Sequence, residues 1–221
     1  KVSRSLDQGT WRSYIQSPPW QWDIVHYDFP ESREERRDLA PLSDFLEKPW
    51  FRRLWVLQEV ALAKQVTLIA GDIRISWENF AFIVQAIHQE ELSRLVFSKR
   101  ARAGANAVVE MQSTRRAMQP LPNCFSWHRH PLLSVLLATS EGECSDVRDR
   151  VYAVLALADD YDFERDIESF GPDYHRSPQE AYIKLARWYI ARRNLDILSC
   201  VAKRGAVHQK TMKGLPSWVP D

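Results

Sequence analysis

The residues with the clearest chemical potential lie in the stretch "KPWFRRLWVLQEV", which covers residues 48–60. On a helix, Trp55 and Glu59 are four residues apart and share one face. A tryptophan can form a dry wall beside a carboxylate, and a charge stabilises a cationic transition state more strongly where water is excluded. The pattern alone favours an ordinary structural role, in which Trp55 belongs to the core and Glu59 pairs with a nearby arginine such as Arg52 or Arg53.

Three more side chains that can do chemistry, Cys124, His128 and His130, lie close together in "CFSWHRH". A tetrahedral zinc site normally combines two such groups at a characteristic spacing, and the sequence has no second cluster of cysteine or histidine. We therefore predict no metal site, and we expect a loop packed by Phe125 and Trp127.

The composition argues against several other classes of function. The seven glycines are not grouped, so a glycine-rich phosphate loop is not expected, and no Gly-x-Ser-x-Gly motif is present. Thirty basic and 29 acidic residues give a net charge of +1, so no overall field attracts nucleic acid or an anionic membrane. No apolar run approaches the roughly 18 residues of a membrane span. Three widely spaced cysteines favour a reducing, cytoplasmic location over a disulfide framework.

The elements that position Trp55 and Glu59 can be predicted from local signals. Residues 1–30 read as irregular, 31–39 as helix-prone, and Ser43 as the cap of a short turn. A helix is expected over 49–63, because proline suits its first position. A hairpin follows within 66–76 around Gly71-Asp72. Helices are then expected over 77–97, with Ser76 as its N-cap, and over 100–118.

The second half of the chain begins after the proline-rich segment 119–131, the clearest internal break, although we expect the whole chain to pack as one unit. Short helices are predicted over 131–139 and 147–158. Asp146 and Asp149 lie near the start of the latter, where they either cap a core helix or bind a partner. The acidic segment 159–170 reads as a surface connector. Ser177-Pro178-Gln179-Glu180 is a capping box that predicts a helix with Tyr182, Leu185, Ala186 and Tyr189 on one face.

One stretch resembles a known family. "PWFRRLWVLQEVALAKQVTLIAGDIRISW" is similar to the third conserved block of the fungal heterokaryon incompatibility (HET) domain, whose Arg-x-Trp-x-x-Gln-Glu core matches Arg53, Trp55, Gln58 and Glu59. Three later stretches, "DVRDRVYAVLALA", "PDYHRSPQEAYIKLARWYI" with "LDILS", and "LPSWVPD", resemble the segments that follow this domain. Together they cover residues 49–221.

The resemblance has departures. Val147 stands where the family usually has proline and Ala156 where it has glycine, and the two earlier blocks of the family have no match. The chain also starts without methionine and stops within a Trp-Val-Pro-Asp run, so we expect a piece of a longer protein.

The resemblance implies a role in fungal non-self recognition and programmed cell death. HET domains are thought to be distant relatives of TIR domains, whose enzymatic members cleave NAD with a glutamate four residues after a tryptophan. By this resemblance Glu59 would be catalytic and stabilise the ribosyl cation, and Trp55, Arg53 and Gln58 would bind the substrate. Trp55 would shape the pocket, and Arg53 and Gln58 would position Glu59 or pair with it, unless Arg53 only anchors the helix. NAD would then be a substrate, and no cofactor is expected.

Three readings of the function stay open. The chain is an NAD glycohydrolase activated by oligomerisation, a non-enzymatic signalling module whose helix is an assembly surface, or an inactive remnant. The partners would be another copy of the chain or an incompatibility protein. The expected fold class is α/β to α+β and predominantly helical. It comprises a lead-in over 1–48, the C-terminal part of a TIR-like domain over 49–97, and a mainly helical extension over 98–221.

Overall fold

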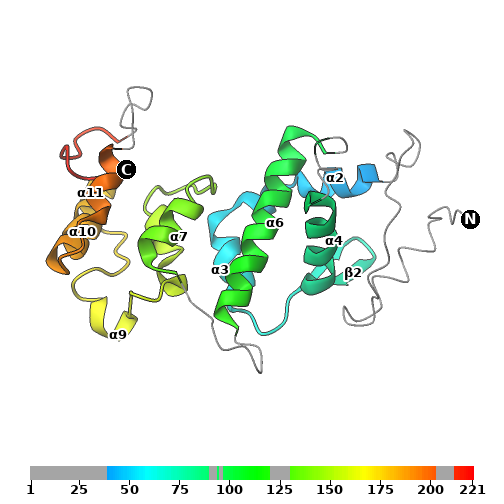
Figure 1. The fold of residues 1–221 in the computed structure, drawn as a ribbon, viewed down its shortest axis with the longest axis horizontal. Helices are drawn as coiled ribbons and strands as arrows, with labels where there is room; N and C mark the ends of the chain where they lie inside the picture. The colour runs from blue at the N-terminus through cyan, green and yellow to red at the C-terminus, as the bar shows by residue number, and fades with distance from the viewer. Residues whose placement is uncertain (1–38, 90–93, 95–96, 120–129, 203–211) are drawn as a thin grey trace, which may run out of the picture. The chain divides into compact units, whose positions relative to one another are not determined.

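The computed structural model describes residues 39–89, 94, 97–119, 130–202 and 212–221 (Figure 1). The fold is predominantly helical, as predicted, and the described strands form one two-stranded sheet. The chain divides into two compact units, residues 1–124 and 125–221, instead of packing as one. The division falls within the proline-rich segment 119–131, where the sequence placed its clearest break.

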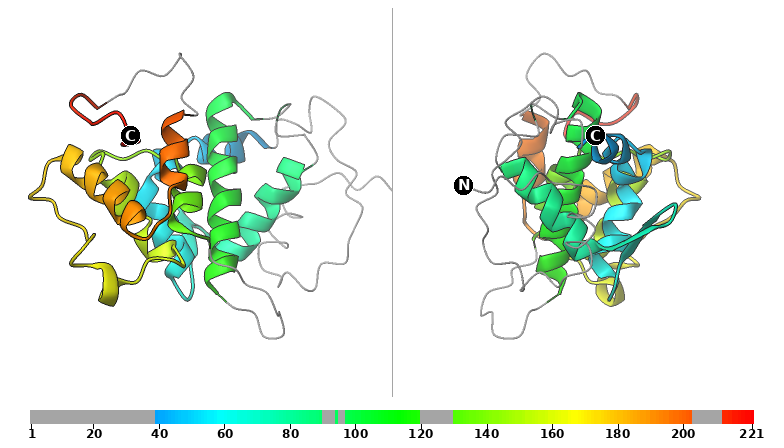
Figure 2. Two further views of the ribbon diagram at one scale, coloured as in Figure 1. Left: turned by 60° about the vertical axis from the view of Figure 1, so that its left-hand side comes forward. Right: turned by 90° about the vertical axis from the view of Figure 1, so that its right-hand side faces the viewer.

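The first unit is built around α6, a 20-residue helix. The other helical elements in the described residues of this unit pack against α6, as the views in Figure 2 show for α3 and α4. The helical elements are α2 (Ala40–Leu46), the 3-10 helix η3 (Pro49–Arg52), α3 (Leu54–Leu62), α4 (Trp77–Gln89) and α6 (Lys99–Met118). The division into units therefore groups α6 with the elements before it, whereas the predicted boundary lay at residue 97.

The single helix expected over 49–63 is wrong in its first part. Residues 49–52 form the 3-10 helix η3, Arg53 is extended with φ −68° and ψ 126°, and only then does α3 begin. A 3-10 helix has poorer hydrogen-bond geometry than an α-helix and stays short. Phe51 holds this turn in place, because its buried ring packs edge-on against Phe45 and stacks on Phe80.

The predicted hairpin is confirmed. Strands β1 (Thr67–Ala70) and β2 (Ile73–Ser76) pair antiparallel with Ala70 opposite Ile73, so the turn has two residues. Gly71 adopts a φ of 60°, which glycine accepts without steric cost and which tight hairpin turns require.

Helix α4 starts where the sequence predicts, and α6 starts one residue before the predicted position 100. The Ser76 hydroxyl accepts a hydrogen bond from the Asn79 backbone N–H at 3.2 Å, which caps α4. The Ser98 hydroxyl accepts from the Ala101 N–H at 3.1 Å and caps α6. The predicted end of α4 near residue 97 cannot be compared, because residues 90–93 lie outside the described part, as do residues 1–38. Ser43 caps no turn, since it is buried inside α2.

The second unit contains six helical elements among its described residues. These are α7 (Leu132–Ala138), α8 (Asp149–Tyr152), η4 (Leu155–Leu157), α9 (Phe163–Asp166), α10 (Pro178–Ala191) and α11 (Asp196–Ala202). The capping box of α10 is confirmed: the Ser177 hydroxyl accepts from the Glu180 N–H, and the Glu180 carboxylate accepts from the Ser177 N–H at 2.8 Å. The four residues predicted to share its inner face are all buried.

The helix predicted over 147–158 is replaced by two short pieces, α8 and η4. Residues 151–155 are all buried, so this segment has no solvent-facing stripe and lacks the one-sided pattern of a surface helix. The chain turns at Ala153 and Val154 between the two pieces. None of the helices in the described residues is sufficiently long and apolar to cross a membrane.

Candidate functional site

Helix α3 carries three of the four residues that the sequence singled out. Its buried side faces the core of the first unit through Leu54, Val56, Leu57, Val60 and Ala61. Trp55 and Gln58 are half-buried, and Glu59 is exposed. The helix therefore brings Trp55, Gln58 and Glu59 together within about one turn. Arg53 is exposed and lies one residue before the helix, at its N-cap.

The ion pair that the sequence left open for Glu59 is not formed within the described part of the chain. No salt bridge joins Glu59 to Arg52 or Arg53 there, and the Arg52 guanidinium donates to the Glu47 backbone carbonyl at 3.0 Å. Glu59 is exposed, so water reaches its carboxylate in the described part of the chain. A site that excludes water at Glu59 needs a second surface.

The C-terminal end of α3 is fixed by Arg115 from α6. The Arg115 side chain is only 5% exposed and donates to the carbonyls of Val60 at 2.7 Å, Ala63 at 2.5 Å and Lys64 at 3.2 Å. It also forms an ion pair with Glu78 at 3.1 Å. The last carbonyls of a helix have no partner within the helix, and the planar guanidinium supplies several donors at once.

Two amide side chains, Gln112 of α6 and Gln119 at its C-cap, also join α6 to neighbouring elements. The Gln119 side-chain amide donates to the Ala63 carbonyl at 2.6 Å, and the Gln112 side-chain oxygen accepts from the fully buried Trp77 indole at 2.7 Å. Sequence reasoning missed Arg115. The available signal is its position on the stripe of α6 that also contains Val108 and Met111, all of them buried.

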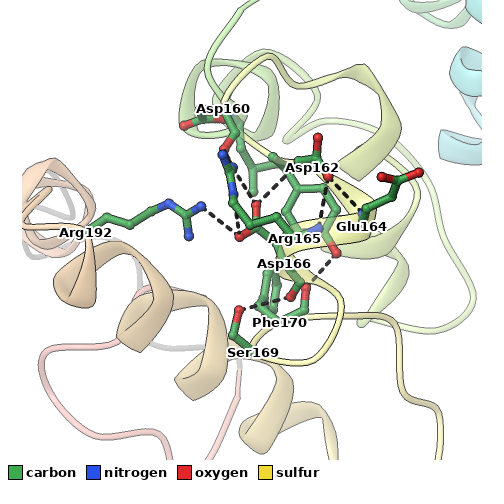
Figure 3. A network of polar contacts seen from close by, with 10 residues as sticks. Asp160, Asp162, Glu164, Arg165, Asp166, Ser169, Phe170 and Arg192 are labelled. Atoms are coloured by element: carbon green, nitrogen blue, oxygen red, sulfur yellow. Dashed lines mark hydrogen bonds and ion pairs between the residues drawn. The ribbon is translucent and has the colours of Figure 1, made fainter.

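A second polar cluster lies in the segment predicted to be a surface connector, and that prediction is wrong for three of its residues. Tyr161, Asp166 and Phe170 are buried, and the Asp166 carboxylate binds two arginines, Arg165 at 2.8 Å and Arg192 at 2.7 Å (Figure 3). The segment looks solvent-exposed in the sequence because it is rich in charged residues. A buried carboxylate, however, needs charged partners of this kind.

The Asp166 cluster is suited to holding structure and unsuited to proton transfer. The hydrogen bond from Arg165 is the main cause that holds the pKa of the Asp166 carboxyl well below its usual range, with the Asp162 N–H and Arg192 adding to it and burial opposing it. The Arg192 guanidinium also stacks over the Trp188 ring at 4.0 Å. A carboxylate that stays ionised in this way anchors α9 to α10 and cannot serve as a general acid.

A third cluster joins two of the stretches that carry the family resemblance. The Arg148 guanidinium binds the Asp146 carboxylate at 2.5 Å and donates to the carbonyls of Tyr174 at 2.7 Å and Arg176 at 2.6 Å. The Tyr174 hydroxyl donates to Asp149 at 2.5 Å. Asp146 and Asp149 thus have partners inside the second unit, and the hydrogen bond from Arg148 lowers the pKa of Asp146.

Most of the predicted cysteine and histidine loop cannot be compared, because Cys124 and His128 lie outside the described residues, with Phe125 and Trp127. His130 is described, and its backbone carbonyl accepts from the Asp159 N–H at 3.1 Å. In the ranges that are described, no three His, Cys, Asp or Glu side chains group so as to hold a metal ion.

The chain was compared with protein-family models, curated proteins and solved structures, and none of them matches.

Proposed function

We propose that this chain is the C-terminal part of a fungal HET domain, TIR-like in fold, together with its downstream region, and that it acts in the cytoplasm in non-self recognition and programmed cell death. The proposal is supported by Arg53, Trp55, Gln58 and Glu59 at the family spacing. It is further supported by the hairpin and α4 that follow this helix.

The activity we propose is hydrolysis of NAD to nicotinamide and ADP-ribose. The bond between the ribose carbon and the nicotinamide nitrogen breaks, and the electron pair leaves with nicotinamide. Water then adds to the ribosyl cation and loses a proton. The Glu59 carboxylate stabilises the positive charge on the sugar, and Trp55 forms one wall of the pocket.

A single observation carries this proposal: Glu59 is a carboxylate without an ion-pair partner in the described residues, one turn from Trp55, on a helix whose end Arg115 fixes. A catalytic group gains from such a rigid support. Because Glu59 is exposed, we propose that self-association of the chain supplies the second wall, so activity should rise steeply with protein concentration.

The test is nicotinamide release from NAD by the purified chain at high concentration. Glu59→Gln keeps the size of the side chain and removes its charge, so release should stop while the circular dichroism spectrum stays unchanged. Glu168→Gln, at an exposed glutamate of the second unit, is the matched control and should retain activity. Equal release from all three chains would exclude Glu59 as the catalytic group.

A specific observation favours a second candidate, the non-enzymatic assembly module. Leu62 is 44% exposed and continues the stripe of Trp55, Gln58 and Glu59 by one further turn of α3. In this case Glu59 would form an ion pair with another protomer. Glu59→Arg should abolish cell death, charge reversal of the partner residue should restore it, and no nicotinamide should be released. Release only from a chain extended upstream would instead identify an incomplete enzyme.

A further inference from the structure

The outer edge of strand β1 is an exposed, uncharged strand edge. Ile69 is 61% exposed, and Thr67 and Ala70 are exposed as well. Natural proteins usually protect such an edge with a charge, a proline or a bulge, because its backbone groups can pair with another strand. Strand β1, Thr-Leu-Ile-Ala, contains no charge and no proline.

The register of the hairpin shows which backbone groups point outward. Ala70 and Ile73 flank the two-residue turn and form its closing pair, and the Trp77 N–H donates to the Val66 carbonyl at 3.0 Å at the other end. In an antiparallel pair, residues that bond across the ladder alternate with residues whose groups face away. The N–H and C=O of Thr67 and Ile69 therefore face the outer edge of β1. The sheet has only two strands among the described residues.

The two edges of the hairpin differ in charge. By the same alternation, Arg74 is the outward-facing residue in the middle of β2, and two β2 strands paired about that residue would place like charges opposite each other. Pairing two β1 strands about Ile69 opposes no charges. It places Ile69 against Ile69 and sets the larger Leu68 against the smaller Ala70. Strand β1 thus complements itself, whereas β2 repels itself.

We propose that two copies of this chain associate by antiparallel pairing of their β1 strands about Ile69, which forms one continuous four-stranded sheet. Three or more strands are more stable than an isolated hairpin, so the pairing also strengthens the hairpin itself. Each strand contributes only four residues, and interfaces of that size are weak and transient. The association is therefore concentration-dependent. It does not depend on the chemistry of Glu59.

Sedimentation equilibrium of the full chain over a wide concentration range tests this pairing. Ile69→Lys places two like charges at the centre of the interface and should weaken the dimer about tenfold or more. Ile73→Lys makes the same change at another exposed isoleucine, 47% exposed, whose backbone groups are already used inside the hairpin. This control should dimerise like the wild type. A monomer at every concentration, or equal weakening by both variants, would overturn the proposal.

Amide hydrogen exchange identifies the edge. On dimerisation the Ile69 N–H should become protected, while the Arg74 N–H on the opposite edge should exchange as fast as in the monomer. Protection of Arg74 with Ile69 unchanged would show that the dimer uses β2 and would refute pairing through β1.

Discussion

Arg115 illustrates how one side chain can define the end of a helix. Its guanidinium satisfies three carbonyls at the end of α3 and pairs with Glu78, all from a position on α6. Removing one partner of a buried polar group leaves the other without hydrogen bonds, which costs more than the bond itself contributed.

We expect Arg115→Ala to lower the free energy of unfolding by about 3 kcal/mol, because the buried Val60 carbonyl, the part-buried Lys64 carbonyl and Glu78 lose this partner together. Urea denaturation followed by tryptophan fluorescence measures this loss. Arg116→Ala is the matched control, since Arg116 is the next residue on α6 and is exposed. That variant should stay within about 0.5 kcal/mol of the wild type. Similar losses in both variants would contradict the role given to Arg115.

The ion pairs of Asp166 should make the stability of the folded protein depend on pH. The folded pKa of its carboxyl lies below the ordinary value of 3.8, so its ion pairs stabilise the fold fully above about pH 4 and progressively less as the pH falls. Asp166→Asn should therefore be less stable than the wild type at pH 7, by about 3 kcal/mol. The two proteins should converge as the pH falls below 4. Thermal unfolding at a series of pH values tests this, and a constant difference between the two proteins would contradict it.

At the scale of elements, the hairpin and the starts of α4 and α10 could be predicted because their signals are local. Gly71, Ser76 and Ser177 act on backbone groups within a few residues of themselves. Local signals could not predict the break at Arg53 or the division of the segment 147–158 into two pieces. These features depend on the burial of Phe51 and of residues 151–155 in the tertiary structure. Of the candidate site, the shared face of Trp55 and Glu59 followed from spacing, whereas its support by Arg115 did not.

The packing of α2 on α6 depends on Gly104. A Cβ atom at this position would lie 2.0 Å from the Leu46 carbonyl oxygen, which is backbone and cannot rotate away. Alanine is the better helix former by about 1 kcal/mol, yet we expect Gly104→Ala to destabilise the protein by about 2 kcal/mol.

The control for this prediction is Asn106→Ala, at an exposed position of the same helix. It should be neutral or stabilise by a few tenths of a kcal/mol, because only helix propensity changes there. The denaturation midpoint of Gly104→Ala should therefore fall, while that of Asn106→Ala should stay unchanged or rise slightly. A stabilising Gly104→Ala would mean that α2 does not approach α6 this closely.

At the scale of the whole molecule, the two units have separate cores, one around Trp77 and Val84 and the other around Leu155 and Leu185. Units with their own cores can unfold separately. We expect Val84→Ala to increase amide exchange in the described helices of the first unit only, and Leu185→Ala to do so in the second unit only. Hydrogen exchange with peptide-level mass spectrometry reads both units in one experiment. Loss of protection throughout the chain from either substitution would indicate a single cooperative unit.

The connection between Arg115 and α3 also has a consequence for protein synthesis. The Ala63 carbonyl accepts a hydrogen bond from a side chain 52 residues further along the chain. While the chain emerges from the ribosome, α3 leaves the exit tunnel well before its closing residue has been translated. The helix that carries Trp55 and Glu59 can therefore reach its final form only after α6 has been made. A nascent chain interrupted before that point would carry these residues on a helix whose C-terminal end lacks the contact with Arg115.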